Sequence, residues 1–188
     1  MTRMKQYAED YLNSSDASNY SYNSEDLYLA VYGYESELSK KLKNLHGIYM
    51  LEFIDGGRYI GSAFHEEGMY NRIKTYMKYS AGSGNPLGNQ ARKDALPKSI
   101  QDKFATDRES FLTDDEDYLT FHILHTVEAI QDEQKYGIFD GDSEILSDML
   151  EFVGDDGFTF YRNLNDNQAE EKYFKELFDT KINGLNLN

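Results

Sequence analysis

The spacing of apolar residues near the start of the chain is that of an amphipathic helix. Between residues 24 and 45, apolar side chains recur at steps of three and four, so they share one helical face. This stripe consists of Leu27, Val31, Tyr34, Leu38, Leu42 and Leu45. Ser24 is a suitable cap for the first turn. We therefore expect a helix from residue 24 to about 45, preceded by a short helix at about 3–12 and a polar loop.

A run of extended character follows and predicts a β-hairpin. Residues 47–54 are mostly apolar, β-branched or aromatic, and Tyr59-Ile60 forms a second run of that kind. The connection between them, residues 55–58, contains the Asp-Gly-Gly sequence that tight turns favour, because glycine tolerates positive φ. Small residues at 61–63 follow the second run directly, so another backbone or a substrate can approach closely there.

The rest of the chain alternates helical segments and loops around one further strand. Helices are expected at 68–79, 90–96, 98–105, 143–152 and 168–179, a strand at 118–128, and a short β-like piece at 158–161. Polar loops are expected at 80–89 and 110–117. His122 and His125 lie three residues apart in the expected strand. We therefore expect them to face opposite sides, one in the core and one exposed.

Length and composition indicate one domain with an aromatic core. The chain has 188 residues, of which 16 are Tyr and 11 are Phe. It contains no Cys, which excludes disulfides, thiolate zinc sites and a cysteine nucleophile. The N-terminal residues have no apolar signal region, and no apolar run is long enough to cross a bilayer. We therefore expect a soluble cytoplasmic protein that makes no membrane contact.

The net charge of −15 argues at first against a protein that binds nucleic acid. The distribution of charge changes this interpretation. Residues 106–170 carry 18 acidic and 3 basic side chains, so this segment alone has a net charge of −15. Residues 47–105 carry 6 acidic and 8 basic side chains and are mildly basic. The segment that contains the hairpin is therefore compatible with a nucleic-acid partner.

Two tripeptides of the hairpin resemble the signature of a known family. Gly47-Ile48-Tyr49 and Tyr59-Ile60-Gly61 are similar to the motifs of the GIY-YIG nuclease superfamily. The further elements of that family follow in order: an Arg in the next helix, a His or Tyr one turn later, a Glu early in an aromatic-rich helix, and an Asn behind it. The residues at these places are Arg72, Tyr76, Glu171 and Asn186. The resemblance covers residues 47–93 and 168–188.

The resemblance implies an α/β (α+β) fold with a small antiparallel β-sheet flanked by helices. We expect residues 47–188 to form the GIY-YIG nuclease domain, with an acidic insertion at about 129–167 that has no counterpart in the family pattern. Residues 1–46 have no counterpart either and would form an N-terminal helical extension. The implied activity is that of a metal-dependent DNA endonuclease, which hydrolyses phosphodiester bonds to 5′-phosphate and 3′-hydroxyl ends.

The resemblance also implies roles for individual residues. Glu171 would hold Mg²⁺ or Mn²⁺, one ion per active site, and a carboxylate is a ligand that such cations prefer. Arg72 would hold the scissile phosphate, and Tyr49 or Tyr59 would activate or position the attacking water. Tyr76 stands where some members have a His, so proton transfer by a His is not expected there. Contacts with the substrate are expected from Asn186, Asn89, Lys74 and Arg92.

Alternatives stay open at the level of sequence. Glu171 could simply be stabilised by a helix dipole, and Arg72 could be half of a salt bridge. A type II restriction-like enzyme for double-stranded DNA is our first choice, because homing enzymes usually add a DNA-binding module and the chain ends two residues after Asn186. A homodimer would cut both strands, whereas a monomer could nick. The alternatives are a phage-encoded free-standing or homing-type nuclease and, from another class, a non-catalytic acidic binding protein or DNA mimic.

Overall fold

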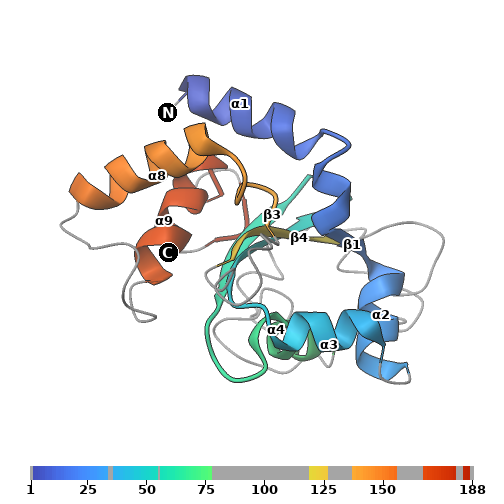
Figure 1. Ribbon diagram of the computed structural model, residues 1–188. Coiled ribbons are helices and arrows are strands. Elements are labelled where there is room, and N and C mark those ends of the chain that lie inside the picture. The colour runs from blue at the N-terminus through green and yellow to red at the C-terminus, as the bar shows by residue number, and fades with distance from the viewer. Residues whose placement is uncertain are drawn as a thin grey trace.

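The computed structural model describes residues 2–33, 36–54, 56–77, 119–126, 137–155, 167–180 and 184–186 (Figure 1). These residues form a mixed α/β structure with a small antiparallel sheet of four strands. The strands are β1 (Ser21–Asn23), β2 (Gly47–Phe53), β3 (Arg58–Ala63) and β4 (Leu119–Thr126). The helices are α1 (Thr2–Leu12), α2 (Ser24–Tyr32), α3 (Glu37–Lys43), α4 (Gly68–Met77), α8 (Ser143–Asp155) and α9 (Asn167–Leu177), with a 3₁₀ helix, η1, at Ala17–Tyr20. None of the described helices has the length and apolar character needed to cross a membrane.

The strands are ordered β1-β4-β2-β3, and every neighbouring pair is antiparallel. β2 and β3 form the expected hairpin, in which Tyr49 lies opposite Gly61 and Leu51 lies opposite Tyr59. The second strand of the hairpin, β3, is longer than expected and continues to Ala63. Because β3 is last in the strand order, the small residues that follow Tyr59-Ile60 lie along one edge of the sheet.

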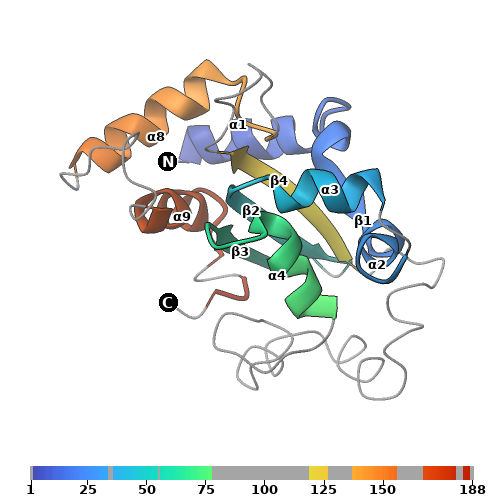
Figure 2. The same ribbon diagram turned by 60° about the horizontal axis from the view of Figure 1, so that its bottom comes forward.

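Helices cover both faces of the sheet (Figures 1 and 2), and one hydrophobic core lies on each face. Successive side chains of a strand point to opposite faces, so neighbours in β2 belong to different cores. Tyr49 and Leu51 pack with α2, α3 and α4, whereas Ile48 and Met50 pack with α1, α8 and α9. The N-terminal residues thus contribute helices to both layers and add β1 at the edge opposite β3.

A β-bulge corrects the expected placement of the two histidines. The register between β2 and β4 shifts by one residue, which interrupts the alternation of side chains along β4. As a result, both histidines contact groups on the face covered by α1 and α9: His122 reaches Glu52, and His125 reaches Glu170. Both are also buried, with 7% and 6% of their surface exposed. The prediction of opposite faces, with one histidine exposed, is therefore wrong.

The helix expected from residue 24 to 45 is in fact two helices. α2 ends before Gly33, whose backbone is extended, and α3 begins after Ser36. Glycine in a helix costs about 1 kcal/mol relative to Ala, which favours a break at this point. Ser36 then caps the new helix by accepting a hydrogen bond from Ser39 N at 3.1 Å. Tyr34, part of the expected stripe, lies outside the described residues.

The start of α2 also differs from the expectation. Asn23 caps the helix by accepting a hydrogen bond from Asp26 N at 2.9 Å, and Ser24 is the first helical residue. The preceding segment was expected to be a loop but contains β1, which pairs with β4. A strand of three residues is stabilised by its distant partner. It is too short to show an alternation of apolar and polar residues, so the sequence pattern does not reveal it.

The other expected elements are confirmed where the structure describes them. α4 and α8 begin where expected, and β4 and α9 begin within one residue of the expected start. α8 continues three residues further than expected, to Asp155. The segments expected at 80–89, 90–96, 98–105, 110–117 and 158–161 lie outside the described residues.

The edge of β3 that has no neighbouring strand among the described residues is hydrogen-bonded by the C-terminal segment. Arg58 O accepts a hydrogen bond from Leu185 N at 2.8 Å. Ile60 is bonded at both of its backbone groups by the side chain of Asn186, which accepts from Ile60 N and donates to Ile60 O, each at 2.8 Å. Because unpaired edge strands readily pair with other chains, these bonds both protect the edge and fix the strand that carries the motif.

Candidate functional site

Ser62, the residue directly after the Tyr-Ile-Gly motif, connects two distant elements. Its carbonyl accepts a hydrogen bond from Arg72 Nε of α4 at 3.0 Å. Its hydroxyl donates a hydrogen bond to Glu171 Oε2 of α9 at 2.5 Å, across 109 residues of sequence. β3 is an edge strand, so both contacts form at the border of the sheet. The structure thereby brings Arg72 and Glu171 together around one residue.

The carboxylate of Glu171 has a partner at each oxygen. Oε2 accepts the bond from Ser62, and Oε1 lies 2.6 Å from Lys175 Nζ, one turn further along α9. Both side chains are largely buried, with 19% of Glu171 and 15% of Lys175 exposed. The acidic residue of the first turn of α9 is Glu170, so stabilisation by the helix dipole applies to Glu170 rather than to Glu171.

Tyr49 of β2 lies directly opposite Gly61, the glycine of the second motif, on the neighbouring strand β3. Its ring stacks on Phe121 with ring centres 4.9 Å apart, and only 1% of the residue is exposed. A Cβ atom at Gly61 would lie 2.3 Å from Tyr49 Oη, so the phenol end covers β3 at a position that requires glycine. Tyr59 is also buried in this core cluster. The two tyrosines therefore lie on the face of the sheet that α2, α3 and α4 cover.

Three candidate side chains approach β3 from different sides of the strand. The hydroxyl of Tyr49 lies on the face that packs with α4, and the carboxylate of Glu171 lies on the face that packs with α9. Arg72 meets the strand at its open edge. A guanidinium and a carboxylate therefore contact Ser62, and the buried phenol of Tyr49 packs over the neighbouring Gly61.

The residues expected to contact the substrate have separate surroundings. Asn186 is buried, and its side-chain amide braces β3 by the two backbone bonds described above. Lys74 lies 2.9 Å from Glu67 and 5.5 Å from the ring centre of Tyr70. The contact with Lys74 lowers the pKa of Glu67. The side chain of Tyr76 lies outside the described residues, as do Asn89 and Arg92.

A buried cluster of acids and a histidine lies under α9 and was not predicted. His125 Nδ1 lies 2.5 Å from Asp140 Oδ1, and Nε2 lies 3.9 Å from Glu170 Oε2. Although burial alone would raise the pKa of Asp140, its contacts with His125 and Thr126 hold this pKa below the usual value. Burial raises the pKa of Glu170 to about 7. No local signal marks this cluster, because it depends on the bulge in β4.

The cluster is aligned with the contacts around Ser62. His125 lies opposite Ile48, and Ile48 lies opposite Ser62, so the three residues form one row across the sheet. Glu170 contacts the first member of this row and Glu171 contacts the last. The beginning of α9 is therefore held over the sheet at two points, which fixes the orientation of Glu171.

The described side chains decide whether the protein alone could enclose a metal ion. They include no group of three or more His, Cys, Asp or Glu side chains that could enclose an ion. Mg²⁺ commonly keeps several waters and binds through one or two carboxylates together with substrate phosphates, so a complete protein cage is not required. Glu171 fits such a role, because its carboxylate contacts the edge strand at Ser62, the residue that Arg72 also contacts.

Comparisons with protein-family models, curated proteins and solved structures find no match for this chain. Its function therefore has to be inferred from the motif residues and from the contacts that they make.

Proposed function

We propose that this chain is a metal-dependent DNA endonuclease of the GIY-YIG type, which hydrolyses phosphodiester bonds to 5′-phosphate and 3′-hydroxyl ends. The observation that carries this proposal is the double contact at Ser62. An arginine and a carboxylate from separate helices meet on the residue that follows the second motif tripeptide. Arginine, carboxylate and phenol are groups that phosphodiester hydrolysis can use for charge stabilisation, metal binding and proton transfer.

The charge that develops during hydrolysis explains the role of Arg72. Negative charge is spread over the non-bridging oxygens of the phosphate and grows on the leaving oxygen. A guanidinium has N–H donors in a planar fork and binds pairs of phosphate oxygens. The bond from Arg72 Nε to Ser62 orients this fork at the sheet edge. Arg72 would therefore bind the scissile phosphate beside β3 and stabilise the transition state.

Tyr49 or Tyr59 would act on the attacking water, and the hydroxyl of Tyr49 lies over the backbone of the edge strand at Gly61. A phenol has an ordinary pKa near 10, so it needs a nearby cation to accept a proton efficiently at neutral pH. Mg²⁺ or Mn²⁺ on Glu171, one ion per active site, would supply charge neutralisation and a polarised water. Arg72 is one positive group that the chain itself supplies at this edge.

A type II restriction-like role on double-stranded DNA is our first choice, in the cytoplasm of a bacterial or phage-infected cell. A homodimer would place one site on each strand. A free-standing or homing-type phage nuclease shares the same chemistry and is distinguished by its cleavage pattern. Contacts of Asn89, Lys74 and Arg92 with DNA belong to the same proposal, whereas Asn186 would support the site through its two bonds to β3.

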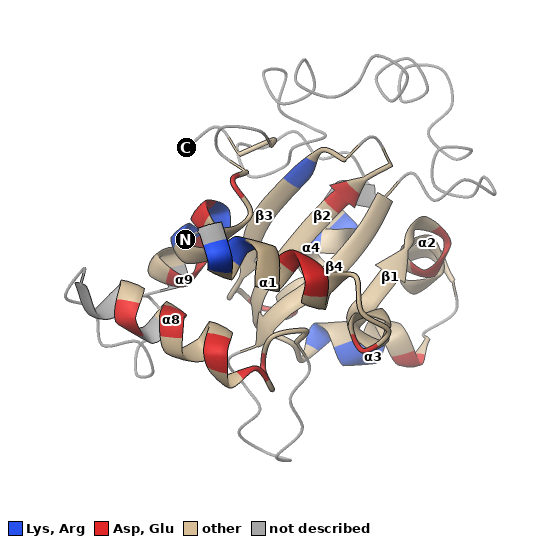
Figure 3. Ribbon diagram, turned by 90° about the horizontal axis from the view of Figure 1, so that it is seen from above, with Lys and Arg blue, Asp and Glu red and all other residues tan. Residues whose placement is uncertain are grey.

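A non-catalytic acidic binding protein is the rival, and α8 is the observation in its favour. The sequence of this helix has four acidic and no basic residues, and Figure 3 shows acidic positions along it. A protein that imitates DNA would bind a basic partner through such a surface. It would not require Arg72 and Glu171 to meet at Ser62.

The test is a magnesium-dependent digest of unmethylated plasmid and phage DNA. Wild type is compared with Glu171→Ala, with Arg72→Lys and with Glu176→Ala as a control on the same helix. Discrete fragments from wild type and Glu176→Ala, with none from the other two, would support a sequence-specific nuclease. A smear would keep the nuclease and remove the restriction role. Absence of cleavage with any metal, or cleavage that survives Glu171→Ala, would contradict the proposal.

A further inference from the structure

Lys175 lies where a cation bound to Glu171 is expected. Its ammonium is 2.6 Å from Oε1 of Glu171, while the hydroxyl of Ser62 donates to Oε2 at 2.5 Å. Both oxygens of the carboxylate therefore have partners within the chain. A positive ion that binds this carboxylate is repelled by the ammonium of Lys175, whereas the neutral hydroxyl of Ser62 carries no such charge.

This pair differs from an ordinary exposed pair one helical turn apart. Exposed glutamate–lysine pairs are weak, because water and salt screen both charges. Only 15% of the Lys175 side chain and 19% of the Glu171 side chain are exposed. The bond to Ser62 also limits rotation of the carboxylate. A charge removed from water in this way needs an opposite charge nearby, and Lys175 supplies it.

A divalent cation on Glu171 Oε1 would lie close to the ammonium group that already contacts this oxygen. Mg²⁺ binds carboxylate oxygens at about 2.0–2.1 Å, so the two positive charges would lie in close contact. Their repulsion is strong where water is largely excluded. On the basis of the proposed function, we propose that Lys175 is a positioning residue. It holds Glu171 in place and has to leave Oε1 before a divalent cation binds there.

This exchange couples metal binding to DNA binding. The ammonium released from Glu171 loses its counter-charge, and a DNA phosphate at the edge of β3 offers a new one. The affinity for the metal is therefore low in the free protein and rises when DNA is present. Removal of the charge of Lys175 abolishes the competition between this lysine and the metal ion. The affinity for the metal then depends much less on DNA.

The experiment is a titration of the full chain with Mn²⁺, followed by electron paramagnetic resonance, with and without a DNA duplex. Wild type is compared with Lys175→Met, with Glu171→Gln and with Lys172→Met. Lys172 is a matched control, because it lies on the same helix but over the ring of Phe152, at 5.3 Å from the ring centre. Without DNA, Lys175→Met should bind Mn²⁺ about tenfold more tightly than wild type. Lys172→Met should match wild type, and Glu171→Gln should lose the site.

The outcomes separate this inference from the function on which it rests. Equal affinity of Lys175→Met and wild type, with loss of binding in Glu171→Gln, would overturn the inference and leave the metal site intact. An equal gain in both lysine variants would show an effect of net charge and would also overturn it. Absence of Mn²⁺ binding that depends on Glu171, with or without DNA, would overturn both.

A second measurement needs no substitution at Lys175. Acylation of lysine amines in the wild-type chain is followed by peptide mass spectrometry, with and without Mn²⁺. Labelling of Lys175 should increase when Mn²⁺ is present, because the released ammonium becomes accessible. Labelling of Lys172 should stay constant. Unchanged labelling of Lys175 at saturating Mn²⁺ would overturn the inference.

Discussion

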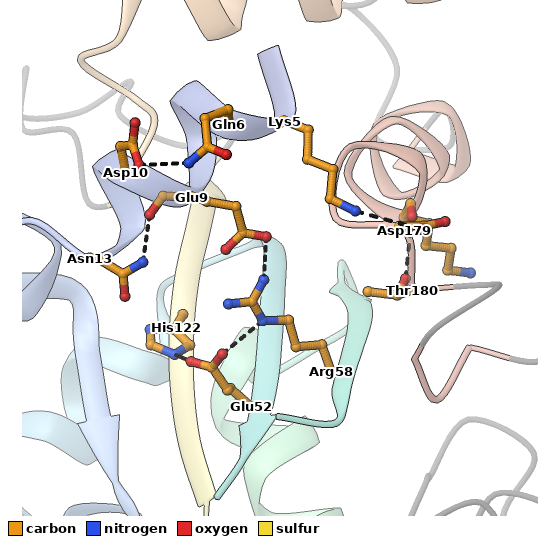
Figure 4. A network of polar contacts seen from close by, with 11 residues as sticks. Lys5, Gln6, Glu9, Asp10, Asn13, Glu52, Arg58, His122, Asp179 and Thr180 are labelled. Atoms are coloured by element: carbon orange, nitrogen blue, oxygen red, sulfur yellow. Dashed lines mark hydrogen bonds and ion pairs between the residues drawn. The ribbon is translucent and has the colours of Figure 1, made fainter. Parts of the chain in front are cut away.

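A chain of charged groups ties the N-terminal helix to the sheet, and Glu52 lies at its centre (Figure 4). Arg58 Nε lies 2.7 Å from Glu52 Oε1, and Arg58 Nη1 lies 2.6 Å from Glu9 of α1. His122 Nε2 lies 3.1 Å from Glu52 Oε2. The hydrogen bond with His122 and the charge of Arg58 outweigh the effect of burial and lower the pKa of Glu52 to about 2.

Protonation of Glu52 is therefore expected to destabilise the fold in acid. The ordinary pKa is 4.5, so between pH 4.5 and about 2 the unfolded chain binds a proton that the folded chain does not. The contribution of Glu52 to stability is complete above about pH 5 and is lost as the pH falls toward 2. It amounts to about 3 kcal/mol at most. Solvent reduces this value, because 28% of the side chain is exposed.

The perturbation is Glu52→Gln, which keeps the shape of the side chain and removes its titration. Urea unfolding of wild type and variant at pH 7 should differ by up to about 3 kcal/mol, and about 2 kcal/mol of that difference should disappear at pH 3. Glu66→Gln, in an exposed loop, is the control for the general effect of acid on this acidic chain. A difference between wild type and Glu52→Gln that is equal at both pH values would refute the reasoning.

Three further predictions concern β3 and its surroundings. Gly61→Ala should lower the free energy of unfolding by about 1–3 kcal/mol in urea, because its Cβ would collide with Tyr49 Oη at 2.3 Å. Asn186→Ala should cost about 1–3 kcal/mol in the same assay, because two buried backbone groups of β3 lose their partner. Lys74→Met should reduce the salt dependence of DNA binding by about one phosphate contact.

Each of these predictions has a control or a contradicting outcome. Gly57→Ala belongs to the same hairpin, but its Cβ would only touch Leu185 at 3.7 Å, so it should be tolerated. Full stability of Asn186→Ala would mean that the edge of β3 is held by other contacts. Lys172→Met removes the same charge as Lys74→Met from a different helix, and an equal change in salt dependence would show that Lys74 makes no specific contact.

Elements with a strong local period were predictable, and those defined by distant partners were not. The hairpin at Gly47–Phe53 and Arg58–Ala63 follows from two β-prone runs and a glycine turn, and its register follows from that turn. The break between α2 and α3 was missed because one glycine interrupts an otherwise continuous stripe. The bulge that turns His125 toward α9 depends on the pairing of β4 with β2, which local sequence does not encode.

The same distinction applies to the candidate site. Arg72 and Glu171 were selected by the order of motif elements, and the structure brings both to Ser62. Ser62 itself was noted only for its small size, because its bond to Glu171 spans 109 residues. Lys175 could have been found from its position one turn after Glu171, but a spacing of four residues does not reveal how deeply a pair is buried.

Acidic and basic residues are distributed unevenly over the described helices (Figure 3). α8 carries four acidic and no basic residues and packs on one face of the sheet. On the other face, α4 carries Arg72 and Lys74 without an acidic residue, and α3 carries three lysines and one glutamate. In the same layer, α2 carries Glu25 and Asp26 and no basic residue. Exposed charges are screened beyond about 8 Å at physiological salt, so a phosphate responds mainly to the face that it approaches. Under the proposed function, a duplex is therefore expected to approach the side of α3 and α4 rather than the side of α8.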